Sequence, residues 1–72
     1  MAKFELTKTI EARKLNPRTK VPLNEWQTIR FGAIIENLAD QDEVTQFSHL
    51  GEYYEYPRGD LKAASQPILP PA

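Results

Sequence analysis

Apolar and polar residues alternate along the first part of the chain, which is the spacing of a half-buried β-strand. Over residues 4–13 the even positions are apolar with one exception: Phe4, Leu6, Ile10 and Ala12. The exception is Lys8, whose ammonium group could reach water at a sheet edge or a bulge. The pattern therefore predicts a first strand over residues 4–13.

Two prolines interrupt the alternation after this strand. Pro17 and Pro22 fix their own φ angles and remove two backbone donors within residues 16–24. This composition predicts a long ordered loop.

Residues 26–38 fit two patterns. As a strand, Ile29, Phe31, Ala33 and Ile35 alternate with polar residues or glycine, with Ile34 as the exception. As a helix, Phe31, Ile34, Ile35 and Leu38 form one stripe, and Asn24 followed by Gln27 resembles a capping box. We favour a strand over residues 28–35, because β-branched and aromatic residues dominate there and Gly32 would weaken a helix by about 1 kcal/mol.

The rest of the chain predicts a turn at 40–43, a strand at 44–49, a turn at Gly51, a strand at 52–56 and a helical turn at 57–64 that buries Leu61. Residues 65–72 contain three prolines and predict an extended, disordered Pro-rich tail. The spacing of Pro67 and Pro70 also fits a polyproline ligand, so docking of the tail onto a partner is the alternative. We expect one domain over residues 1–64 and a tail over residues 65–72.

Large apolar side chains are the expected core of so short a chain. We expect this core to contain Phe4, Phe31, Phe47 and either Tyr54 or Tyr56. Trp26 and Tyr53 are the aromatic residues expected to stay partly exposed.

The predicted order of elements, with a long first loop, closely spaced strands and a final helical turn, resembles that of the SH3-like small β-barrels. Residues 29–35 occupy the place of a barrel strand with a glycine before its apolar centre, and Tyr56-Pro57 followed by Asp60-Leu61 is similar to the closing turn. The resemblance implies an all-β, partly open barrel of about five short strands. It does not extend to the tandem Trp and Pro-x-Asn-Tyr segments with which SH3 domains bind proline-rich peptides, nor to the catalytic Val-Gln-Ile-Tyr run of plasmid-type dihydrofolate reductases, of which only Tyr56 is matched.

The amino-acid composition excludes some kinds of functional site. The chain has 72 residues, one histidine and no cysteine, which leaves neither a disulfide framework nor a thiolate metal site. His49 and Ser48 are adjacent, so on a strand they point to opposite faces and cannot act as base and nucleophile. We expect no enzymatic activity, no cofactor and no metal. The charged first eight residues and the shortness of the apolar runs predict a cytoplasmic chain with no membrane segment.

Charge is unevenly distributed. Residues 1–30 hold seven basic and three acidic residues, whereas residues 31–60 hold one basic and seven acidic residues. We favour pairing of the two halves within the fold, and the alternative is a basic face for an acidic partner or nucleic acid.

These observations predict a non-enzymatic interaction module that binds an unknown protein partner or forms a homo-oligomer. Its anchors would be Trp26 and Tyr53, since both residue types are enriched at binding hot spots. The alternative is a nucleic-acid-binding barrel that uses basic residues on and beside the first loop: Arg13, Lys14, Arg18 and Lys20.

Overall fold

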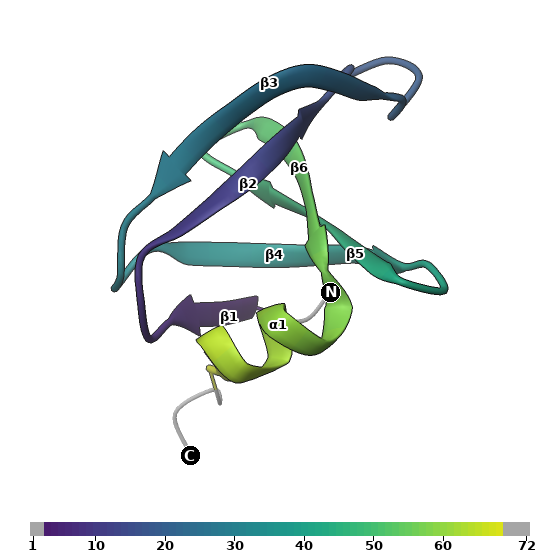
Figure 1. Cartoon of the computed structure of the whole chain (residues 1–72). Helices are drawn as coiled ribbons and strands as arrows, with labels where there is room; N and C mark the ends of the chain where they lie inside the picture. Colours follow the sequence, from purple (N-terminus) through teal and green to yellow (C-terminus); the bar gives the residue numbers. More distant parts are fainter. Residues whose placement is uncertain (1–2, 69–72) are drawn as a thin grey trace.

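Seven strands and one short helix make up the computed structural model, which describes residues 3–68 (Figure 1). In chain order they are β1 (Lys3–Leu6), β2 (Ile10–Leu15), β3 (Pro22–Ile29), β4 (Ile34–Asp40), β5 (Val44–His49), β6 (Glu52–Pro57), α1 (Arg58–Ala64) and β7 (Ser65–Pro67). The strands form one antiparallel sheet in the order β3-β2-β6-β5-β4-β1-β7. The predicted all-β class is confirmed.

The sheet is open, with β3 and β7 as its two edges. Figure 1 shows the β2–β3 hairpin arching over one side of the molecule, while α1 lies on the other side, where it contacts β5, β6 and β7. The principal extents of 39 × 24 × 22 Å reflect this elongated arrangement.

The first predicted strand is wrong as one continuous element. Residues 7–9 form a bend that separates β1 from β2, and the two strands pair with different neighbours. The bend is held by a long-range bond, since the Thr7 N–H donates to the Ala64 carbonyl at 2.8 Å. Lys8 lies exposed in this bend, where its ammonium group is free to contact water.

The predicted loop is shorter than expected, because residues 22–24 belong to β3. Asn16 organises the turn that remains: its Oδ1 accepts the backbone N–H groups of Arg18 at 2.8 Å and Thr19 at 3.2 Å. Pro22 can begin a strand here because β3 is an edge strand, where a missing N–H need not break the sheet.

Residues 26–38 form neither the single strand nor the helix. β3 ends at Ile29, a turn follows in which Gly32 has a φ of 85°, and β4 begins at Ile34. Phe31 lies in this turn and is 73% exposed, so its assignment to the core is wrong.

The later elements match the predicted order closely. β5 covers 44–49, β6 covers 52–57, and α1 buries Leu61 as expected. The tail is different: Ser65–Pro67 forms β7 and pairs with β1, so the prediction of disorder is wrong for these three residues. The end of the predicted tail, residues 69–72, lies outside the described residues.

Phe47 is the centre of the core. It is fully buried, and its ring stacks on that of Tyr54 with centroids 5.6 Å apart. Phe4 and Tyr56 are partly buried against this cluster. The core assignments of Phe47 and Tyr54 are therefore confirmed.

Candidate functional site

Trp26 lies near the middle of β3, on the outward face of the β2–β3 hairpin, and is 56% exposed. Its partner across the strands is Arg13 of β2, whose guanidinium carbon lies 5.0 Å from the centre of the indole ring. Arg13 is held there by a second contact, because its Nε donates to the Leu23 carbonyl at 2.7 Å. The result is an aromatic side chain fixed in place by a cation and still open to solvent.

Tyr53 makes a second pair of the same kind. The Lys20 Nζ lies 3.9 Å from the centre of the Tyr53 ring and donates to the Pro17 carbonyl at 2.7 Å. Lys20 has a positive φ of 61°, and this turn conformation belongs to the β2–β3 connection.

The two pairs share one face of the sheet. Arg13 is opposite Trp26 on one side and Glu55 of β6 on the other. Tyr53 lies two residues before Glu55, and residues two apart on a strand share a face. We call Arg13, Lys20, Trp26 and Tyr53 together the cation–aromatic face.

Lys14 and Arg18 do not join this face. Lys14 follows Arg13 on β2 and is directed elsewhere, with its Nζ 3.4 Å from Glu52 Oε2. Arg18 is exposed in the turn between β2 and β3. The structure thus brings together two of the four basic residues singled out from the sequence, together with both aromatic anchors.

The carboxylate of Glu52 also accepts the Tyr54 hydroxyl at 3.0 Å. This hydrogen bond, followed by the charge of Lys14, lowers the pKa of Glu52. Burial, followed by the same bond to Glu52, raises the pKa of Tyr54 to about 12. Lys14, Glu52 and Tyr54 therefore form a local network that joins β2 to β6 rather than a site for a ligand.

β3 adds a second feature to the same surface. It is eight residues long, six of them are exposed, and no strand pairs with its outer side within residues 3–68. The opposite edge, β7, has only three residues and ends at Pro67. Short strands and prolines protect sheet edges from pairing, so β3 is the more accessible edge.

Sequence reasoning missed the two most exposed large apolar residues of the described chain. Phe31 and Leu50 are 73% and 88% exposed, and they line one hollow between the turn before β4 and the turn before β6. Leu50 could have been found from its position, since Leu50-Gly51 is a two-residue loop between strands and both residues adopt positive φ. Phe31 carried no such signal, because the turn around it depends on distant contacts.

Within residues 3–68, no group of three or more His, Asp or Glu side chains is placed to hold a metal ion. No helix in this range has the length and apolar character needed to cross a membrane. The His49 Nδ1 lies 3.0 Å from the Ile34 carbonyl and so ties β5 to β4.

Comparison of the chain with protein-family models, curated proteins and solved structures finds no significant match.

Proposed function

We propose that this protein is a non-enzymatic interaction module with an SH3-like, partly open barrel, and that it binds an extended acidic segment of a partner protein along β3. The observation that carries the proposal is the coincidence of an unpaired eight-residue edge strand with the partly exposed Trp26 on that strand.

An unpaired edge offers backbone groups to an incoming strand. A peptide that adds to such an edge gains affinity from main-chain hydrogen bonds and specificity from side-chain contacts on the faces. On β3 the adjoining face presents Trp26 and, one strand further in, Arg13. Trp26 is therefore positioned to pack on a side chain of the added strand.

The charged residues of the β2–β3 hairpin indicate the charge of the partner. The β2–β3 hairpin from residue 10 to residue 29 holds four basic and two acidic residues, in a chain whose net charge is −1. An acidic segment would be attracted to this hairpin while it is repelled by the remainder of the chain. A second copy could supply such a segment, which makes a homo-oligomer one form of the same proposal.

Nucleic acid is the second candidate, favoured by the closeness of cations and aromatic rings on one face. Three of the four basic residues already have partners inside the fold: Arg13 with Leu23, Lys14 with Glu52, and Lys20 with Pro17. A phosphate or a carboxylate would meet the same competition at these cations, and a protein partner ranks first because the unpaired edge of β3 also offers main-chain hydrogen bonds to a strand.

The experiment uses the fluorescence of Trp26, which is the only tryptophan in the chain. The protein is titrated in about 0.15 M salt with an alternating Thr-Glu decapeptide, an alternating Thr-Lys decapeptide and a twelve-nucleotide oligo-dT. We expect the acidic peptide alone to change the emission in a saturable way and to shift backbone amide signals of β3 in NMR spectra. Sedimentation at several protein concentrations reports self-association in parallel.

Trp26→Ala should abolish binding, measured by NMR, while changing the free energy of unfolding by no more than about 1 kcal/mol, because its ring is exposed and an exposed cation–aromatic contact such as that with Arg13 contributes about 0.5–1 kcal/mol. Phe31→Ala is the matched control, since it removes a more exposed aromatic residue outside the cation–aromatic face. Preferential binding of oligo-dT with a steep salt dependence would overturn the proposal in favour of nucleic acid. Equal binding of both peptides, or retained binding by Trp26→Ala, would also overturn it.

A further inference from the structure

Phe31 and Leu50, the two most exposed large apolar side chains of residues 3–68, lie together at one end of the edge strand β3. They line a hollow of about 570 Å³ to which Gln27, Ile29 and Arg30 also belong, and we call it the Phe31/Leu50 hollow. Exposed apolar surface with a polar rim marks interaction sites. Because both apolar side chains are open to solvent, a partner can reach them directly.

Leu50 occupies a turn position that a leucine does not favour. It has a φ of 51° and is followed by Gly51 with a φ of 81°, in the two-residue connection between β5 and β6. Such turns favour Asn or Gly at the first position, because the Cβ of other residues crowds the backbone at positive φ. A leucine that is 88% exposed here supplies the fold with neither a favourable turn nor core burial, so its side chain is available for another contact.

The alternation of side chains along β3 places the Phe31/Leu50 hollow and Trp26 on opposite faces. Ile29 is buried in the core, so Gln27, two residues before it, also faces the core side of the sheet. Trp26 is adjacent to Gln27 and faces outward. A strand that adds to β3 alternates in the same way, so its successive side chains meet Trp26 on one face and the hollow on the other.

The unpaired charge of the hollow is positive. Arg30 is exposed and has no carboxylate within ion-pair distance among residues 3–68. Glu52, the acidic residue of the hollow, is engaged by the Lys14 Nζ at 3.4 Å and by the Tyr54 hydroxyl at 3.0 Å. A cation beside two exposed apolar side chains complements an acidic segment that carries an apolar residue.

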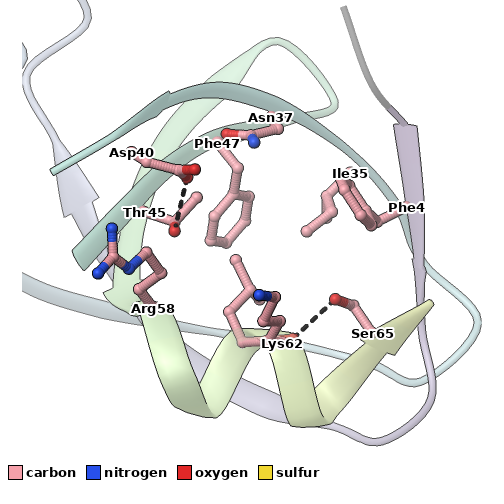
Figure 2. A pocket seen from close by; sticks show the side chains of 10 residues that line it. Phe4, Ile35, Asn37, Asp40, Thr45, Phe47, Arg58, Lys62 and Ser65 are labelled. Carbon is pink, nitrogen blue, oxygen red and sulfur yellow. Dashed lines mark hydrogen bonds between the residues drawn. The ribbon is translucent and has the colours of Figure 1, made fainter. Parts of the chain in front are cut away.

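A second hollow, beneath α1, is out of reach of such a strand (Figure 2). None of its described lining residues belongs to β3, and Phe47, which lines it, is fully buried. The Asp40 carboxylate in this hollow already accepts the Thr45 hydroxyl at 3.0 Å, a bond that Figure 2 shows. A strand that pairs with β3 therefore has the Phe31/Leu50 hollow as its apolar site.

We propose that the partner strand carries a bulky apolar residue that enters the Phe31/Leu50 hollow, and that it runs antiparallel to β3. This inference rests on the proposed function and adds to it the kind of residue that the partner presents. All strand pairings among residues 3–68 are antiparallel, and antiparallel pairing is the more stable per residue. In that direction the N-terminal end of the partner strand lies beside Phe31, and its C-terminal end lies beside the β2–β3 turn.

Three peptides test this arrangement in about 0.15 M salt: the alternating Thr-Glu decapeptide, and two versions in which Leu-Leu replaces either its first or its last Thr-Glu pair. These N-terminal and C-terminal leucine peptides have the same composition and differ only in which end is apolar. Adjacent leucines place one side chain on each face of the added strand, so one of them meets the hollow whichever face the register selects. Binding is followed by Trp26 fluorescence and by NMR of the ¹⁵N-labelled full chain.

We expect the N-terminal leucine peptide to bind about tenfold more tightly than the C-terminal one, because partial burial of one leucine side chain changes an equilibrium constant by about that factor. The backbone amides of Phe31 and Leu50 should shift most with the N-terminal leucine peptide, while that of Leu61, beside the second hollow, should not move. The double variant Phe31→Ala/Leu50→Asn should abolish the tenfold difference and still bind the alternating Thr-Glu decapeptide as the parent does. Asn suits residue 50 because it tolerates a positive φ.

The matched control is Ile34→Ala/Ile68→Ala, which removes two exposed apolar side chains that do not line the hollow and should preserve the tenfold difference. Equal binding of the two leucine peptides, tighter binding of the C-terminal one, or a difference that survives Phe31→Ala/Leu50→Asn would overturn this inference and leave the proposed function standing. Failure of the alternating Thr-Glu decapeptide to bind would overturn the proposed function and this inference with it. The inference is also wrong if Phe31→Ala/Leu50→Asn loses binding to phosphatidylcholine–phosphatidylglycerol vesicles instead of the difference between the peptides, because the hollow would then contact a lipid surface.

Discussion

Removal of β7 tests whether the end of the described chain is part of the fold. Stopping the chain after Ala64 removes three residue pairs of the β1–β7 ladder: Phe4 with Pro67, Glu5 with Gln66, and Leu6 with Ser65. It also removes the Ser65 hydroxyl bond to Leu61 and the bond from the Ile68 N–H to the Lys3 carbonyl at 3.0 Å. The shortened chain would leave β1 as an unprotected edge.

The expected loss of stability follows from the contacts that the truncation removes. Intramolecular hydrogen bonds contribute about 0.5–1.5 kcal/mol each, so losing this set should cost about 2–4 kcal/mol. Domains of this size are stable by roughly 4–11 kcal/mol, and 1 kcal/mol corresponds to about 4–8 °C in melting temperature. We therefore expect the melting temperature to fall by at least about 8 °C.

The assay compares thermal unfolding of a chain ending at Ala64 with that of a chain ending at Ile68, so that only residues 65–68 differ. Ser65→Ala in the longer chain is the control that separates the helix bond from the strand ladder, and it should cost about 1 kcal/mol. A difference of less than about 4 °C between the two truncated chains would refute the argument that β7 stabilises the fold.

Two further predictions concern single aromatic side chains. Phe47→Ala should destabilise the protein by about 3–5 kcal/mol in urea unfolding, whereas Phe31→Ala should change it by less than about 1 kcal/mol, because Phe47 is fully buried and Phe31 is 73% exposed; equal effects would contradict the assignment of the core. Burial, followed by the hydrogen bond to Glu52, raises the pKa of Tyr54 to about 12 in the folded protein, from about 10 in the unfolded chain. The stability that the protonated Tyr54 contributes is therefore fully present below about pH 10 and is lost as the pH rises towards 12. The loss is at most about 3 kcal/mol, and Tyr54→Phe should show a shallower decline in urea unfolding between pH 9 and about 11.5; parallel declines would contradict the raised pKa.

The elements predicted best are those whose boundaries depend on local signals. β5 and β6 are bounded by an acidic turn and by a two-residue loop that ends in Gly51, and each has one buried face. Turn residues and period-two alternation are both visible in a short window of sequence. The prediction of α1 succeeded for the same reason, since it follows directly after Pro57.

The elements predicted worst are divided by bends that form through distant contacts. The bend after β1 and the turn before β4 bond to each other: the Gly32 N–H donates to the Leu6 carbonyl at 2.8 Å, and the Phe31 N–H donates to the Thr9 hydroxyl at 3.2 Å. Alternation of apolar residues continues through the second break and is interrupted at Lys8 alone in the first, so each pattern is that of one strand. Only the tertiary fold reveals that each of these stretches contains a change of direction.

The exposure of Trp26 was predicted correctly, but its position was not. A loop was predicted over residues 16–24, just before Trp26, whereas the structure places Trp26 inside an edge strand that begins at Pro22. The pairing with Arg13 comes from the register of β2 and β3, which depends on the length of the turn between them. The sequence could therefore supply the members of the cation–aromatic face but not their arrangement.

The charge distribution connects the fold to the proposed partner. Pairing of the basic and acidic halves was expected, and β2 does lie beside β6, where Lys14 contacts Glu52 and Arg13 is opposite Glu55. β6 can neutralise only the side of the hairpin that it borders, because β3 forms the far edge of the sheet. Arg18 and Lys20 of the β2–β3 turn lie just before the open strand, and they are the cations that the proposed acidic partner would meet at the start of β3.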